Sequence, residues 1–161
     1  MSLERLFLAV ALLAVALAVA GCERATTDDA GVRLKPNDAN VVAQGAKVYA
    51  AHCAACHGAN LQGQPNWRVR DAVGRLPAPP HDATGHTWHH PDEVLFNITK
   101  QGVAKVANLK DYDTAMPAFE GVLSDAEIIA VLSWIKAQWP PEIRAQQDEV
   151  TRAARSNAAS R

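Results

Sequence analysis

Residues shortly after position 38 carry the apolar spacing of a helix. Val41, Gly45 and Tyr49 follow one another at intervals of four residues, so they share one face of a helix that reaches His52. A polar residue at position 37 or 38 (Asn or Asp) can cap the amino end of this helix. Glycine is costly inside a helix, so we expect Gly45 to let a second helix approach closely.

Two later segments carry signals of helix ends as well as apolar residues. Residues 91–102 begin with proline and two acidic residues, which suit a first turn, and end in glycine, which suits a stop. Residues 124–139 begin with Ser124 and Glu127, which form a capping box, and continue with an apolar stripe. Pro140-Pro141 is expected to end this last helix.

The remaining segments are long and irregular. Residues 58–91 and 103–121 show no strong strand pattern, so the expected fold class is all-α with three or more helices. We expect the domain to span residues 38–140, and residues 141–161 to form a polar tail outside its core, with a frayed helix as the form it can take. About 100 residues with this much loop would bury only a thin core. Something other than side chains is therefore expected to fill the middle of the domain.

The first residues have the pattern of an export signal. Leu6 to Ala20 is an uninterrupted apolar run, short for a membrane span of about 20 residues but well sized for a signal-peptide core. Val-Ala-Gly before Cys22 resembles the lipobox of bacterial lipoproteins. We expect a signal peptide over 1–21 and a flexible linker over 22–37 anchored by lipid on Cys22. The alternatives are cleavage nearby or an uncleaved anchor, with Cys22 incidental.

Charge and cysteine count narrow the class of protein. A net charge of −1 does not favour a nucleic-acid partner. The chain has three cysteines, and lipid on Cys22 would leave only Cys53 and Cys56. Exported proteins meet an oxidising environment in which spare thiols pair, so we expect these two cysteines to be used together.

The sequence Cys53-Ala-Ala-Cys56-His57 has the C-x-x-C-H spacing of covalent haem attachment. Two thiols at this spacing can add to the two vinyl groups of a haem, and the histidine that follows can bind the iron. A redox thiol pair would begin a helix after a strand, whereas this motif follows a helix. A zinc site would need two more ligands, normally a second cysteine pair or paired histidines, and the chain has no second pair.

Met116 is the candidate for the second axial ligand of the iron. It would be the single methionine left after removal of a signal peptide, and it lies in a loop before the last helix, next to Pro117. A lone methionine is usually core filling. However, histidine and methionine together ligate the iron of electron-carrying cytochromes, and the soft thioether raises the potential.

The chain resembles the class I c-type cytochromes with a single haem, over residues about 41 to 139. The resemblance rests on a first helix that ends in CAACHG, a long loop, a middle helix, Met-Pro and a terminal helix. It implies an all-α cytochrome c fold in which the first and last helices cross over one covalently attached haem c. Gly45 and Tyr49 match the glycine and aromatic residue of the family's first helix, and Trp134 would be their partner on the last.

The resemblance also implies a proline carbonyl that accepts a hydrogen bond from the histidine ligand. Pro79 is the first choice for this proline, and Pro65 is the alternative. Trp88 can pack on the haem edge or donate its indole N–H to a propionate, and Arg75 can pair with a propionate.

A histidine-rich segment departs from the family pattern and includes His81, His86, His89 and His90. One hypothesis is a second metal site, with copper as a candidate, and another is that a histidine replaces Met116 on the iron. The simplest interpretation is a polar loop whose side chains cap the middle helix and bond the haem propionates. His52, which precedes the motif, is expected at the surface.

These observations favour an electron carrier over an enzyme. We expect a periplasm-facing, membrane-tethered cytochrome that passes single electrons between redox proteins, with no small-molecule substrate. The alternatives are a haem subunit of an oxidase or dehydrogenase complex, a peroxidase-like site if Met116 does not bind, or a sensor built on the histidine-rich loop. Three lysines can ring the haem edge and favour an acidic partner: Lys100, Lys105 and Lys110.

Overall fold

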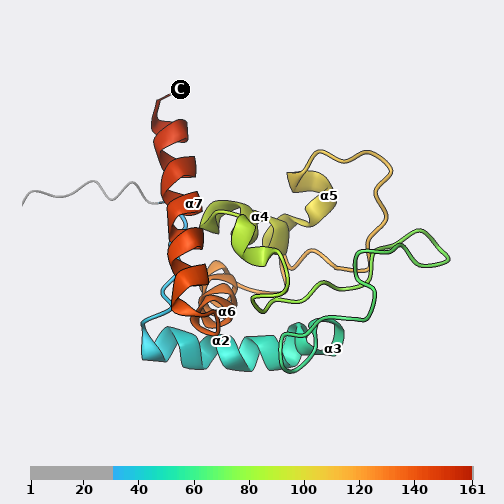
Figure 1. Cartoon of the computed structure of the whole chain (residues 1–161), viewed down its shortest axis with the longest axis horizontal. Coiled ribbons are helices and arrows are strands. Elements are labelled where there is room, and N and C mark those ends of the chain that lie inside the picture. The colour runs from blue at the N-terminus through green and yellow to red at the C-terminus, as the bar shows by residue number, and fades with distance from the viewer. Residues whose placement is uncertain (1–30, 161) are drawn as a thin grey trace, which may run out of the picture. The chain divides into compact units, whose positions relative to one another are not determined.

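The computed structural model describes residues 31–160, and residues Val32 onward form one compact unit. Within these residues the secondary structure is helical and without strands, which confirms the all-α fold class (Figure 1). The elements are α2 (Ala39–His52), α3 (Ala54–His57), the 3-10 helix η1 (Thr87–His89), α4 (Asp92–Gln101), α5 (Val103–Val106), α6 (Asp125–Ala137) and α7 (Pro141–Ala159). The expected signal peptide, Cys22 and most of the expected linker lie outside the described residues.

Helices α2 and α6 pack closely where Gly45 meets the backbone of α6. A Cβ atom at Gly45 would lie 2.0 Å from the carbonyl oxygen of Ala130, so only glycine fits this crossing. Tyr49 and Trp134 pack beside it, with ring centroids 4.6 Å apart. Figure 1 shows α6 crossing α2 at a steep angle instead of running along it. The close approach predicted from Gly45 and the aromatic pair predicted from the resemblance are both present.

Capping interactions fix the ends of the two long core helices. The carboxylate of Asp38 accepts hydrogen bonds from the Asn40 and Val41 amides, which begins α2. Ser124 and Glu127 form the predicted capping box of α6. The middle helix differs slightly from expectation, because Pro91 is the cap residue of α4 rather than part of its first turn. None of the histidine side chains caps α4, which corrects that part of the simplest interpretation.

The core lies between α2, α4 and α6. Its buried apolar side chains come from these helices and from the loops that join them, and Trp139 closes one end. In the part of the chain that the structure describes, no helix is both long enough and apolar enough to span a membrane.

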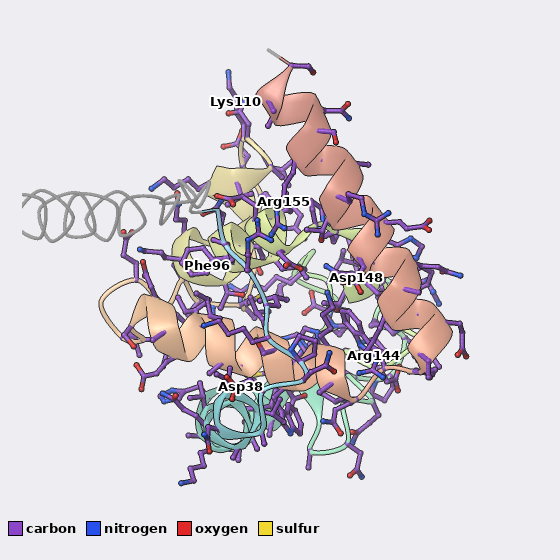
Figure 2. All side chains as sticks on the ribbon, turned by 90° about the vertical axis from the view of Figure 1, so that its left-hand side faces the viewer. Asp38, Phe96, Lys110, Arg144, Asp148 and Arg155 are labelled. Atoms are coloured by element: carbon purple, nitrogen blue, oxygen red, sulfur yellow. The ribbon has the colours of Figure 1, made fainter. Side chains whose placement is uncertain are left out.

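The carboxyl-terminal residues differ most from expectation. Residues Pro141–Ala159 form α7, a helix of 19 residues, instead of a tail outside the core. Proline suits its first turn, where no backbone N–H is needed. Its buried side chains are polar: Gln147 is fully buried and Thr151 is 6 % exposed. Asp148 and Arg155 extend from α7 toward the rest of the domain (Figure 2).

Residues 32–37, which were expected to belong to a flexible linker, are bound to the domain. The Leu34 amide donates to the Asp92 carboxylate over 3.1 Å, and the Lys35 amide donates to Ser133 Oγ over 2.8 Å. The Arg155 guanidinium donates to the Val32 carbonyl over 2.6 Å. The domain therefore begins near Val32 and ends in α7.

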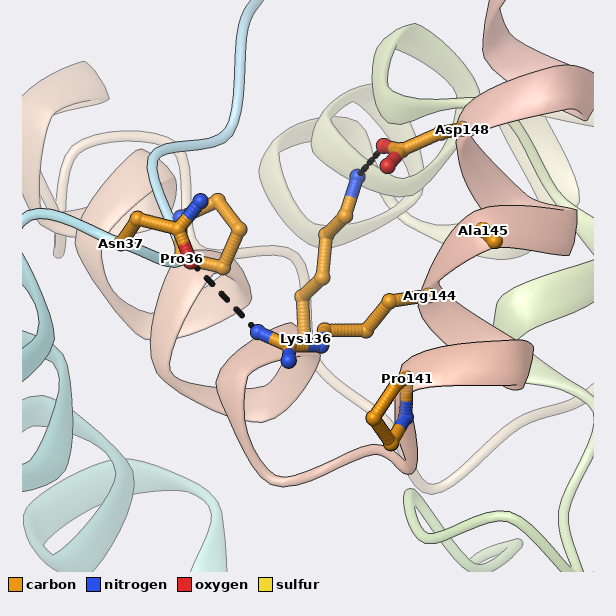
Figure 3. Close-up of a pocket in the computed structure, with 7 residues that line it drawn as sticks. All are labelled: Pro36, Asn37, Lys136, Pro141, Arg144, Ala145 and Asp148. Carbon is orange, nitrogen blue, oxygen red and sulfur yellow. Dashed lines mark hydrogen bonds and ion pairs between the residues drawn. The ribbon is translucent and has the colours of Figure 1, made fainter.

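A pocket lies where this amino-terminal segment meets α6 and α7 (Figure 3). Its walls are formed by Pro36, Asn37, Lys136, Pro141, Arg144, Ala145 and Asp148. None of the residues of the C-x-x-C-H motif line it, so we do not assign the haem to this pocket.

Candidate functional site

The C-x-x-C-H motif occupies a single helical turn after α2. Cys53 separates α2 from α3, and its carbonyl accepts hydrogen bonds from the amides of Cys56 (3.1 Å) and His57 (2.9 Å). Residues three apart in a helical turn lie on the same side, so the turn presents both thiols together. The two cysteines form no disulfide with each other; Cys53 is half-buried, Cys56 is exposed and His57 is 6 % exposed.

The Cys53 thiol lacks the acidity of a redox-active cysteine. Burial, reinforced by charge on Cys56, raises the pKa of Cys53 to about 11. Reactive thiol pairs have the opposite shift, because a helix amino end or a nearby cation stabilises the thiolate. The electrostatics therefore oppose the thioredoxin-like alternative for this motif.

The His57 imidazole is anchored by the carbonyl that the family resemblance indicated. Its Nδ1 lies 2.8 Å from the carbonyl oxygen of Pro79. Burial lowers the pKa of His57, and the hydrogen bond to Pro79 offsets this only in part, so the ring is neutral at pH 7. A neutral ring that donates from Nδ1 leaves Nε2 with a free electron pair, which is the state that a metal ligand requires.

A tight turn brings Pro79 to the histidine ring. The Gly63 amide donates to the His57 carbonyl over 2.7 Å, and the Gln64 amide donates to the Ala78 carbonyl over 2.8 Å. Gly63 has φ 67°, and a Cβ there would lie 2.4 Å from the Pro80 nitrogen. The turn therefore needs glycine both for its conformation and for its closeness to the proline segment.

Met116 lies in the loop between α5 and α6 and is partly buried. It packs against the same buried cluster that Cys53 and Trp88 contact. Its amide donates to Thr114 Oγ1 over 3.1 Å, which orders the backbone beside it. Two cysteines can attach a haem covalently, and a neutral buried imidazole and a partly buried thioether are donors for its iron, so the residues present fit this cofactor. Ligation by Met116 stays a prediction.

The two predicted propionate partners have protein partners in the structure. The Trp88 indole N–H donates to the Ala83 carbonyl over 3.3 Å, and its ring stacks on His89 with centroids 3.7 Å apart. Arg75 is exposed, and its Nε lies 2.7 Å from the Asp113 carboxylate. Contact of Trp88 or Arg75 with the haem stays a prediction, and Arg75 would have to share its guanidinium with Asp113.

The histidine-rich segment divides into His81, which contacts His57, and a group of three histidines that do not. His81 stacks on His57 with ring centroids 4.0 Å apart, whereas His86 lies between Trp67 and His90. Among residues 31–160 no three side chains of His, Cys, Asp or Glu converge as a metal site. Sequence reasoning missed the His57–His81 contact, although the position of His81 two residues after Pro79 was a signal.

His52 is exposed, as expected, and lies edge-on to Phe119 with ring centroids 6.3 Å apart. The three lysines proposed to surround the haem edge lie on different segments. Lys100 pairs with Asp125 at 2.7 Å, Lys105 lies in α5, and Lys110 follows α5. A role for them in docking stays a prediction.

Comparison with known proteins places the site in a family. Residues 40–135 match the family model described as cytochrome c oxidase, cbb3-type, subunit III. The matched residues include the C-x-x-C-H motif, Pro79 and Met116. No curated protein and no solved structure matches the chain significantly. The match covers more than half of the chain and agrees with its helical fold, and the chain therefore belongs to this family of c-type cytochrome domains.

Proposed function

We propose that the protein is a membrane-tethered electron carrier with one haem c, facing the periplasm of a bacterium. The observation that carries the proposal is the C-x-x-C-H turn, with His57 buried, neutral and anchored on the Pro79 carbonyl. A haem c supplies one-electron chemistry through its iron. The family supports haem-based electron transfer, and the partners would be redox proteins.

The residues of the chain have separate roles in this proposal. Cys53 and Cys56 would tie the cofactor to the turn between α2 and α3 through thioether bonds. His57 would bind the iron through Nε2, and Pro79 holds the ring by accepting a hydrogen bond from Nδ1. Met116 would supply a thioether as a second iron ligand, which favours the reduced state. With His57 and Met116 both bound, the iron would have no position left for a substrate.

Replacing Met116 with alanine should free one coordination position on the iron and leave the haem attached. We expect loss of the weak ferric absorption band near the red end of the spectrum, a lower midpoint potential and rapid binding of carbon monoxide to the reduced protein. The potential should fall because the thioether that favours ferrous iron is gone. Absorption spectroscopy and redox titration measure all three.

The matched control is His89→Ala, which removes an exposed histidine and should change none of these properties. Rapid carbon monoxide binding by the reduced wild type would show an open iron position, and a peroxidase-like or oxidase role would then replace electron carriage. Absence of the red band in the wild type, together with carbon monoxide binding gained by His89→Ala but not by Met116→Ala, would assign the second ligand to the histidine-rich loop.

The proposed tether depends on Cys22, which lies outside the described residues. Replacing Cys22 with alanine should move the protein from the membrane fraction to the soluble periplasmic fraction, because the lipid would have no attachment point. Fractionation of cells, with detection of covalent haem, measures the distribution. If Cys22→Ala leaves the protein in the membrane fraction, the tether is an uncleaved anchor or a protein partner.

The second candidate is a haem subunit of a larger oxidase-type complex, which the description of the family favours. A subunit would migrate with a complex that contains further haems when mild detergent extracts of the native membrane are separated by size. Migration at the size of a single chain in its detergent micelle supports the carrier.

A further inference from the structure

The face of the His57 imidazole is covered by the ring of His81. Their centroids are 4.0 Å apart and their planes are inclined by 25°, which is a stacked arrangement. The other fixed point of His57 is at its edge, where Nδ1 meets the Pro79 carbonyl over 2.8 Å. A single hydrogen bond at its edge would leave the His57 ring free to rotate about the axis of that bond. Contact of the His81 ring with its face restricts this rotation.

His81 is itself held from several sides. Its amide donates to the Leu61 carbonyl over 2.8 Å, and its carbonyl accepts from the Trp139 indole over 2.7 Å. Its ring Nδ1 lies 2.9 Å from Thr87 Oγ1, which is buried on η1. Tyr49 meets the ring edge-on at 6.3 Å. Contacts within the protein alone therefore fix both the backbone and the ring of His81.

We propose that His81 is a positioning residue that sets the plane of the His57 imidazole at the iron. The inference rests on the proposed function, because it takes His57 as an iron ligand. Pro79 and His81 hold different parts of the ligand, since the Pro79 carbonyl fixes the ring edge and the His81 ring fixes the ring face. Residues that hold a ligating histidine orient it and tune its metal. A planar side chain is needed at position 81, because only a flat group can define the plane of its neighbour.

Two substitutions of similar bulk separate this role from simple packing. His81→Leu fills the space without a flat ring, whereas His81→Phe keeps the ring. Electron paramagnetic resonance of the ferric protein reports the orientation of the axial imidazole through the g-values of its low-spin signal. We expect His81→Leu to broaden this signal or split it into more than one low-spin species, with a shifted midpoint potential. We expect His81→Phe to keep a single species close to the wild type.

The control is His86→Leu, which makes the same exchange at a histidine of the same segment that stacks on Trp67 instead of on His57. This variant should leave the g-values and the midpoint potential unchanged. An unchanged signal in His81→Leu, or equal changes in the leucine and phenylalanine variants, would overturn the positioning role. Failure of the proposed function is distinguishable, because the wild type itself would then lack covalent haem or a low-spin signal.

Discussion

Replacing Gly45 with alanine should destabilise the domain strongly, although alanine is the better helix former. The added Cβ would lie 2.0 Å from the Ala130 oxygen, 2.6 Å from its carbonyl carbon and 2.7 Å from Trp134 Cβ. Two of these atoms are backbone, so relief requires α2 and α6 to separate. Overpacking typically costs about 1–3 kcal/mol. We expect a loss of about 3 kcal/mol in the free energy of unfolding, measured by urea denaturation of the haem-loaded protein, because the clash involves backbone.

The opposing helix-propensity effect can be measured separately. Ala50 is exposed on α2, so Ala50→Gly should lower the free energy of unfolding by about 1 kcal/mol through helix propensity alone. Gly45→Ala should gain the same helix-propensity free energy but lose the close packing of α2 on α6. If Gly45→Ala raised the stability as much as Ala50→Gly lowers it, the predicted clash between α2 and α6 would be wrong.

The local signals of the sequence predicted the features that lie within one element or follow a motif. The Asp38 cap, the capping box at Ser124 and the close packing at Gly45 depend on a few neighbouring residues, and all are present. The Pro79 contact with His57 joins residues far apart, but the family pattern indicated it. These features could be expected from the chain alone because their physical causes are local or tied to a recognised spacing.

The packing of α7 on the domain could not be predicted from local signals, because its buried face is polar. Gln147 and Thr151 replace the apolar stripe that marks a core helix, and their partner Asp92 lies on α4, far back in the sequence. The matched family region also ends at residue 135, before α7 begins. The His57–His81 stack was missed for a related reason: it depends on how an irregular loop folds back.

The polar contacts of Asp92 give the second large prediction. Asp92 is 4 % exposed, and its carboxylate lies 3.8 Å from Lys136 Nζ and 3.6 Å from the Arg155 guanidinium. It also accepts hydrogen bonds from the Leu34 amide (3.1 Å) and from Gln147 Nε2 (2.8 Å). One carboxylate therefore joins α4, α6, α7 and the amino-terminal segment.

Replacing Asp92 with alanine should cost about 3 kcal/mol in the free energy of unfolding, because it removes one partner of a buried ion pair together with the acceptor of two hydrogen bonds. Lys136, 3 % exposed, would keep only Asp148 (Figure 3). Glu93→Ala is the matched control: its carboxylate is exposed, so the change should stay within about 0.5 kcal/mol.

A double variant identifies the source of this loss. Adding Lys136→Met to Asp92→Ala removes the buried lysine charge that Asp92 no longer balances. The double variant should therefore lose less free energy of unfolding than the two single variants lose together. The remaining loss then comprises the hydrogen bonds of Asp92 to Leu34 and Gln147, its ion pair with Arg155, and the ion pair between Lys136 and Asp148. Additive losses would show that Lys136 is satisfied by Asp148 alone, and α7 would then be held by that pair rather than by Asp92.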